Sequence, residues 1–410
     1  MAGFRPVERA GRGNPAGRVG FDLAREVAYD QTRYFSFMRW KPVDVASGHG
    51  RARSGHRTAV AALLLACTVT GTHAYAPQNR FDRRAQDRLE DSRRKEGEAL
   101  LNLADAAMSG RTTSDFSIRW SNDFFKAQTG TFVPFTVTVD RSSLTAANGL
   151  MYVRAARREG STSRSPDGGA RYPFDIIFPV ALSAPAGQPV RITRGFAVAP
   201  GEYDVYVALR ERPTDPLASD RRLKGAVLKQ PLTVPDFWSG ELAASTVMLA
   251  DRIDDVPAPV VGDEVLERPY VIGTQEIHRA AEASFRRSRE LIVVFLIYNA
   301  TVSREKDFDI EVDYHLFRRD AAAPPEPASG DAAHPPARAG ERYVTRTPPQ
   351  RFRPSMMGSD FDPGTGPILA GQGILLSSFQ EGEYRLGITV TDLMSRRSLS
   401  RDVMFSVAGS

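Results

Sequence analysis

The sequence is poor in cysteine and in long apolar runs. Cys67 is the only cysteine among 410 residues, which excludes a disulfide framework within the chain. No window approaches the roughly 18 uncharged apolar residues that a membrane-spanning helix requires, so we expect no permanent span. Hydrophobic residues nevertheless make up 41% of the chain, and its length is sufficient for two or three globular domains.

Motifs of known chemistry are also missing. The three histidines beyond residue 76 stand alone, without a second His or Cys at the spacing of a zinc site. They are His278, His315 and His334. The sequence has no Gly-x-Ser-x-Gly, no P-loop and no dinucleotide-binding glycine cluster. We therefore predict a protein that is not an enzyme and that uses no cofactor.

The basic net charge of +5 is concentrated at the N-terminal end. Residues 1–76 hold 11 of the 54 Lys and Arg residues but only 5 of the 49 Asp and Glu, which leaves about −1 for the rest. A nearly neutral body has no overall electrostatic attraction for nucleic acid. Nucleic-acid binding is therefore not expected.

Residues 51–76 have the pattern of a cleavable signal peptide. Three arginines precede an uncharged apolar run over 58–71, and the small residues Ala74 and Ala76 then match a cleavage site. The alternative is a buried core helix. We predict export to the periplasm, the outer envelope or the exterior, and we interpret residues 1–50 as disordered or as an over-extended start.

Cys67 closes the segment Leu-Leu-Ala-Cys, which resembles a bacterial lipobox. In such a segment the thiol is lipidated and the cysteine becomes the new N-terminus. Ordinary cleavage farther along the chain is the alternative. Contact with a membrane is thus expected only through the signal peptide or a lipid anchor.

Residues 80–110 predict a helix. Leu100, Leu103, Ala104, Ala107 and Met108 form one apolar stripe, and a glycine at position 110 suits a helix C-terminus. The preceding half of the segment is polar all round, which is typical of a solvated helix or stalk.

From residue 114 the apolar residues recur with period two, which indicates short antiparallel strands. We predict a mainly β fold of two antiparallel immunoglobulin-like β-sandwiches, preceded by the single helix. The first would span 114–236 and the second 265–410, with a linker over 237–264. The apolar run 291–298 predicts a central strand that is buried on both faces.

A repeated phrase supports a duplication. Residues 199–209 (APGEYDVYVAL) match residues 380–390 (QEGEYRLGITV). Gly201 and Gly382 would supply the turn, and Tyr203 and Tyr384 would bury their rings with the hydroxyl free to cap a backbone group. The phrase resembles the tyrosine corner of immunoglobulin-like sandwiches. It also resembles the C-terminal β-sandwich regions of exported acidobacterial-type proteins without an assigned activity, which implies a fold and no function.

A few side chains are candidates for binding. Asp360 and Asp362 lie in an oxygen-rich loop that could hold Ca²⁺, although a turn is the favoured interpretation. The acidic alternation over 307–313 is compatible with Ca²⁺ or a basic partner, and ion pairs with a neighbouring strand are favoured. Trp238 is either a sugar-binding platform or, as we favour, a plug between the sandwiches.

The hypothesis that follows is a non-catalytic envelope or secreted protein whose tandem sandwiches bind another protein. The alternative is a carbohydrate-binding accessory module that uses Ca²⁺. The sequence leaves the partner and the oligomeric state open.

Overall fold

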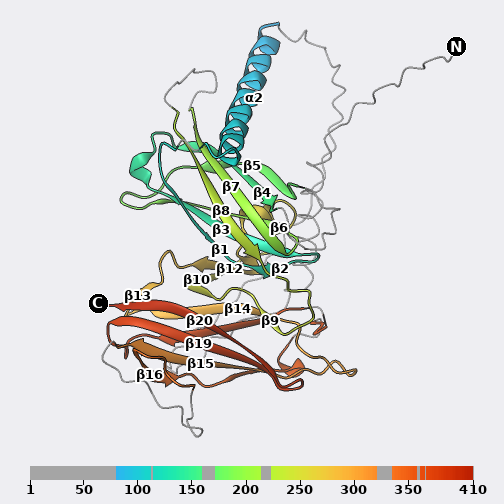
Figure 1. The fold of residues 1–410 in the computed structure, drawn as a ribbon, viewed down its shortest axis with the longest axis vertical. Helices are drawn as coiled ribbons and strands as arrows, with labels where there is room; N and C mark the ends of the chain where they lie inside the picture. Colours follow the sequence, from blue (N-terminus) through green and yellow to red (C-terminus); the bar gives the residue numbers. More distant parts are fainter. Residues whose placement is uncertain are drawn as a thin grey trace, which may run out of the picture.

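The computed structural model describes residues 80–111, 114–158, 171–213, 223–320, 335–357, 361–364 and 366–409. The predicted signal peptide, Cys67, His334 and Asp360 lie outside these ranges. The prediction of a mainly β fold with β-sandwich domains is confirmed: a long helix stands at one end of two stacked sandwiches (Figure 1).

Helix α2 (Arg80–Met108) packs its C-terminal half on the first sandwich. Leu100 and Ala104 are fully buried against Tyr152 and Tyr206, while the N-terminal half projects beyond the sheet (Figure 1). Gly110, at a φ of 78°, ends the helix, and the bonds from Gly110 N to Ala107 O and from Arg111 N to Ala106 O form a Schellman motif. Within the described ranges no helix has both the length and the apolar character to cross a bilayer.

The first sandwich pairs a β3 sheet with a β7 sheet, named after their central strands. In the β3 sheet, β1 (Ile118–Asn122) and β2 (Phe125–Lys126) pair with one edge of β3 (Thr131–Val139), and β6 (Val190–Val198) pairs with the other. The β7 sheet has the order β5 (Phe174–Ala181), β4 (Asn148–Arg157), β7 (Gly201–Arg212), β8 (Gly225–Val234).

The second sandwich pairs a β14 sheet with a β19 sheet. The β14 sheet has the order β11 (Val271–Ile272), β12 (Gln275–Arg279), β10 (Met248–Asp255), β14 (Glu290–Tyr298), β18 (Ile368–Leu375), and β9 (Ala243–Ala244) also pairs with β14. The β19 sheet has the order β13 (Ser284–Arg286), β20 (Arg397–Ala408), β19 (Gly382–Asp392), β15 (Ile310–Arg319), β16 (Glu341–Arg346), and β17 (Gln350–Phe352) also pairs with β15.

Short helical turns connect some of these strands: η1 (Arg141–Ser143), α3 (Glu264–Glu267) and η2 (Pro354–Met356). Among the described strands, the pairing departs from the predicted antiparallel pattern at β13, which runs parallel to β20.

The two sandwiches repeat one strand order. In the first, β4, β7 and β8 are neighbours and β6 pairs with β3; in the second, β15, β19 and β20 are neighbours and β18 pairs with β14. The repeated phrase opens β7 and β19, where Gly201 and Gly382 share a φ of 144°. Tyr203 Oη donates to Ala199 O at 2.8 Å and Tyr384 Oη to Gln380 O at 2.6 Å, so each hydroxyl caps the carbonyl four residues earlier.

The β14 sheet is covered on both faces. Its residues Leu291, Val293 and Phe295 belong to the core of the second sandwich, whereas Val294 and Leu296 join an apolar core that continues into the first sandwich. The apolar run over 291–298 of β14 has this physical reason: the first sandwich packs on the outer face of its sheet.

The segment predicted as a linker, 237–264, contains two strands of the second sandwich. β9 and β10 both pair with β14, and Met248 and Ala250 are fully buried. The prediction of a linker was wrong here because strand formation depends on tertiary pairing. The exposed half of β10 (Asp251–Asp255) has the composition of a loop but obtains its hydrogen bonds from β12.

Candidate functional site

A buried polar cluster of Asp123, Tyr270 and Arg279 joins the two sandwiches. Asp123 is fully buried, and its Oδ2 accepts hydrogen bonds from Tyr270 Oη at 2.6 Å and from Arg279 Nη1 at 2.7 Å. Burial raises the pKa of Asp123, although Arg279 and Tyr270 act in the opposite direction. Burial and the Asp123 carboxylate together raise the pKa of the Tyr270 phenol well above its usual value. The cluster therefore ties residues of β12 and the α3–β11 connection to the β1–β2 turn.

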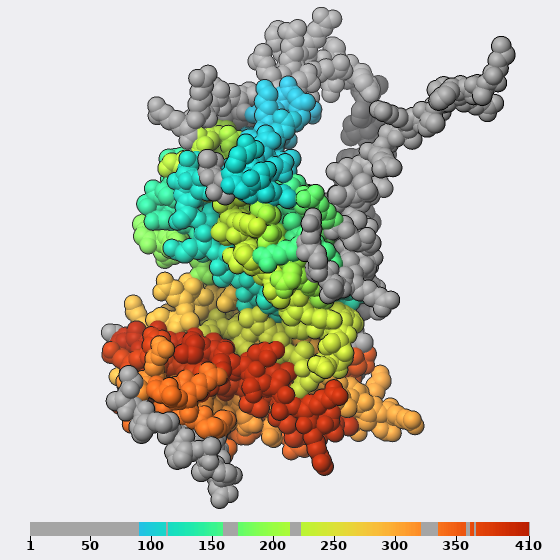
Figure 2. Space-filling model, viewed as in Figure 1, coloured from blue at the N-terminus to red at the C-terminus, as the bar shows by residue number. Residues whose placement is uncertain are grey.

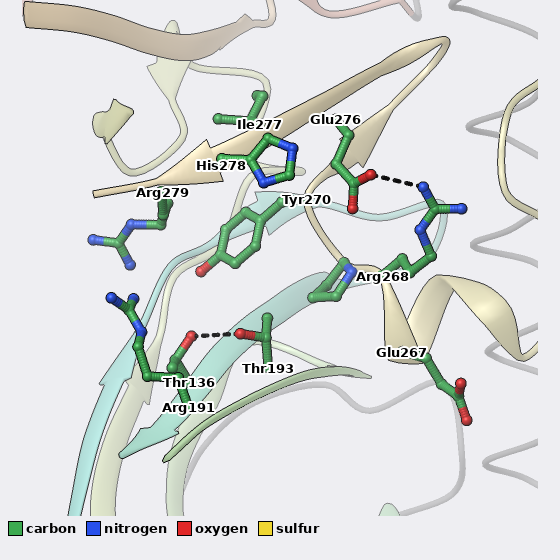
Figure 3. A pocket seen from close by; sticks show the side chains of 11 residues that line it. Thr136, Arg191, Thr193, Glu267, Arg268, Tyr270, Glu276, Ile277, His278 and Arg279 are labelled. Carbon is green, nitrogen blue, oxygen red and sulfur yellow. Dashed lines mark hydrogen bonds and ion pairs between the residues drawn. The ribbon is translucent and has the colours of Figure 1, made fainter. Parts of the chain in front are cut away.

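A polar cleft of about 240 Å³ lies beside this Asp123 cluster (Figure 3). Acidic side chains lie against most of its basic residues: Arg268 reaches Glu264 at 2.9 Å and Glu276 at 2.8 Å, and Arg279 reaches Asp123 at 2.7 Å. These contacts occupy two of the guanidinium groups that an anionic ligand would use, and Arg191 is the arginine of the lining without an acidic partner among the described residues. We therefore interpret the cleft as part of the junction between the sandwiches.

A larger groove of about 440 Å³ runs along β20, and we call it the β20 groove. Its walls are residues 401–404 of β20 and residues 244–247, which comprise the end of β9 and its connection to β10. The first sandwich contributes Phe124, and the connection between the sandwiches contributes Pro235 and Phe237. In Figure 2 the red surface of the C-terminal strands runs beneath the yellow-green surface of that connection. The β20 groove thus brings together segments nearly 280 residues apart in the sequence.

One wall of the β20 groove is an open sheet edge. β20 pairs with β19 along most of its length, but on its other side β13 pairs only with residues 406–408. Ser406 N donates to Ala283 O at 2.7 Å on the β13 side. Because main-chain groups alternate along a strand, those of Ser400, Asp402 and Met404 face this side too. No strand among the described residues pairs with them there.

The opposite wall has already used its main-chain groups. Ser245 N donates to Leu296 O at 2.8 Å, and Thr246 N donates to Phe124 O at 3.2 Å. Phe124 N in turn donates to Thr246 Oγ1 at 2.9 Å. This wall therefore offers a ligand mainly surface to pack on, while β20 offers a row of hydrogen-bonding groups.

The acidic residues considered as Ca²⁺ ligands do not form a cluster in the described part of the chain. Asp362 is half exposed, with Lys306 Nζ 3.7 Å from its Oδ1, and Asp360 lies outside the described residues. Across the described ranges no three His, Cys, Asp or Glu residues come close enough to share a metal ion. Within the acidic alternation, Asp309 is paired with Arg351 and Arg353, which lower its pKa to about 2.

Trp238 is not a buried plug, because 51% of its surface is exposed. Its Nε1 donates to Ala127 O at 3.0 Å, and Lys126 Nζ lies 4.0 Å from the ring centroid. The neighbouring residue, Phe237, is the buried one: it is 5% exposed, with its ring 5.1 Å from that of Tyr298. Tertiary packing decides which of the two aromatic rings is covered, and the sequence carried no signal that separates them.

Sequence reasoning also missed the Asp123 cluster and the β20 edge. Asp123 stands in Ser-Asn-Asp-Phe-Phe, which has the composition of a turn. Its partner Arg279 is 156 residues away. The alternation of β20 predicts a strand but carries no information about which strands flank it.

Neither a protein-family model nor a curated protein matches the sequence. Among solved structures, Salmonella alpha-2-macroglobulin reacted with methylamine is similar at 10% identity over 72% of this chain and 17% of its own, with a TM-score of 0.19. Escherichia coli alpha-2-macroglobulin activated by porcine elastase is similar at 10% identity over 72% of this chain and 35% of its own, with a TM-score of 0.20. This chain spans far less than two thirds of either protein, and likeness at these TM-scores carries no argument about function.

Proposed function

We propose that this chain is an exported, non-catalytic protein that binds another protein through the β20 groove. One observation carries the proposal: an open sheet edge forms one wall of a groove at the junction of two sandwiches. Main-chain groups along such an edge need hydrogen-bond partners, and protein partners supply them in many complexes. The signal-peptide pattern of residues 51–76 supports export.

The lining of the groove favours a protein over a carbohydrate. Phe124, Phe237 and Val403 contribute apolar surface, whereas sugar platforms use exposed aromatic faces. Trp238 is the exposed aromatic ring of this region, and the Lys126 ammonium group lies over one of its faces. Phe125, a nearby aromatic residue of β2, is almost fully buried. A carbohydrate-binding module thus remains the second candidate, with Trp238 as its platform.

Site-specific photo-crosslinking tests the proposal. A photoreactive amino acid replaces Met404, which lines the groove and is 47% exposed, in the full chain. The matched control replaces Met356, which is 64% exposed on η2 and does not line the groove. We expect a discrete protein adduct from position 404 in an envelope extract and none from position 356.

A glycan array with and without Ca²⁺ separates the two candidate functions. Protein docking predicts no reproducible glycan signal. Ca²⁺-dependent glycan binding, together with the same adducts from positions 404 and 356, would overturn the proposal and favour the carbohydrate-binding module.

A further inference from the structure

We propose that the β20 groove binds an extended segment of its partner, acidic at its ends and apolar at alternate positions, which adds to β20 as a new strand. This inference rests on the proposed function and specifies the chemistry of the partner. It depends on three features of the described residues: the hydrogen-bonding row of β20, the apolar opposite wall and the charge around the edge.

The hydrogen-bonding row has the repeat of a strand. Ser400, Asp402 and Met404 each direct an N–H and a C=O to the open side, at intervals of about 6.8 Å, twice the rise per residue of an antiparallel strand. The carbonyl of Ser400 accepts from Arg401 Nη1 at 3.1 Å, a contact that an added strand would replace. The same side of β20 already accepts a strand, because β13 pairs with Ser406 and Val407 in a parallel register. An added segment would continue the sheet along the line of β13.

The opposite wall determines which side chains the segment carries. The inner face of the β19 sheet faces the β14 sheet, so alternate side chains of an added strand would point into the β20 groove. There they would meet Val247, Phe237 and the inward side chain of Val403. We therefore expect small or branched apolar residues at every second position and polar residues between them.

The charge around the edge favours acidic ends. Five arginines around β20 are exposed and have no acidic partner among the described residues: Arg396, Arg397 and Arg401 at the start of the strand and along it, and Arg286 and Arg289 at its far end, where β13 pairs. They outnumber the exposed acidic residue just before β13, Glu282. The acidic residue of β20, Asp402, is already paired with Arg385 at 3.0 Å and with Arg338. A second copy of the chain would place these arginines against each other, so a partner with acidic residues is favoured over self-pairing.

A peptide-binding experiment with the full chain tests strand addition. The probe is a fluorescein-labelled nonapeptide, Glu-Asp-Val-Thr-Val-Thr-Val-Glu-Asp, measured by fluorescence anisotropy. A version with lysine at all four acidic positions should bind at least tenfold more weakly. N-methylation of the alternate amides that face β20 should weaken binding at least tenfold, whereas N-methylation of the other amides should have less than a threefold effect.

Met404→Pro is the decisive variant. The amide of Met404 faces the open side, so proline removes no hydrogen bond to β19, while its ring blocks an added strand. Met404→Ala keeps the amide and is the matched control. We expect Met404→Pro to bind the peptide at least tenfold more weakly than Met404→Ala, with similar unfolding midpoints showing that both variants fold.

Equal binding by the two Met404 variants, or equal effects of both N-methylation patterns, would overturn strand addition. If the adduct from position 404 persists in that case, the proposed function stands without it; if the adduct is absent and no peptide binds, both proposals fail. A dimer that sedimentation velocity detects and that Met404→Pro abolishes would show that the partner is a second copy of the chain and not an acidic segment.

Arg401→Glu tests the charge argument. This variant should bind the acidic peptide more weakly and the lysine version more tightly than the unaltered chain does. Unchanged affinities for both peptides would contradict the charge argument.

Discussion

Replacing Asp123 with alanine tests how the two sandwiches are held together. The substitution removes the acceptor of two hydrogen bonds, one from Tyr270 Oη at 2.6 Å and one from Arg279 Nη1 at 2.7 Å. Tyr270 is 7% exposed, so its hydroxyl would lose its carboxylate acceptor in a position with little access to solvent. The side chain of Arg279 is 26% exposed and would recover part of its hydration.

The expected loss is about 3 kcal/mol of unfolding free energy. Hydrogen bonds to charged groups contribute about 1.5–3 kcal/mol each, and breaking a buried ion pair costs about 3–5 kcal/mol. Two effects place the value near the lower end. Arg279 reaches solvent, and removal of the Asp123 carboxylate also removes the cost of burying it. Asp123→Asn keeps the shape and one acceptor oxygen, so its loss should be smaller.

Urea unfolding followed by two probes measures the effect. The tryptophans of the described residues, Trp120 and Trp238, lie in the first sandwich and the connection after it, so their fluorescence reports on that part of the molecule. Far-UV circular dichroism reports on the strands of both sandwiches. Because an apolar core continues between the sandwiches, the two probes should give one coincident transition, at a lower urea concentration in Asp123→Ala.

A loss below about 1 kcal/mol would refute the stabilising role of the Asp123 cluster, given the range for buried pairs. Two separate transitions in the unaltered protein would refute the continuous core as the coupling element. Asp309→Asn is the control for loss of a carboxylate at the surface, where a pair is worth about 1 kcal/mol or less.

Three further outcomes are expected. Tyr384→Phe removes the hydrogen bond to Gln380 O and should lower the unfolding free energy by about 1 kcal/mol, measured by urea unfolding; no loss would contradict a role for the hydroxyl. Leu100→Ala should weaken the packing of α2 on the β7 sheet by about 2–3 kcal/mol. Amide hydrogen exchange should then be faster in α2 than in the strands, because the helix detaches without unfolding of the sandwich. Equal exchange rates in α2 and the strands would exclude such local detachment. The folded-state pKa of Asp309, about 2, is below its ordinary value of 3.8. Its contribution to the unfolding free energy is therefore present above pH 4 and is lost as the pH falls toward 2. Asp309→Asn should lack this pH-dependent contribution, and 1 M salt should reduce it in the unaltered chain.

Local patterns explain why much of the fold could be predicted. The apolar stripe of residues 100–108 and the glycine at position 110 indicate a helix and its end, and α2 ends at Met108 with a Schellman motif around Gly110. The alternation of β15 and the apolar run of β14 are contained in a few consecutive residues, and so is the repeated Gly-Glu-Tyr phrase. Such signals depend on the period of the backbone and on turn geometry, both of which are local.

The candidate site could not be predicted in the same way. The β20 groove combines Phe124, residues 244–247 and residues 401–404, which no sequence pattern connects. Whether a strand has a free edge depends on the path of other segments, here on β13 pairing with only the last three residues of β20. The helix, the strands and the repeated tyrosine turn were thus determined by the sequence itself. The tertiary structure decided which faces are covered, which charges are paired and which edge stays open, because these properties arise only when distant segments meet.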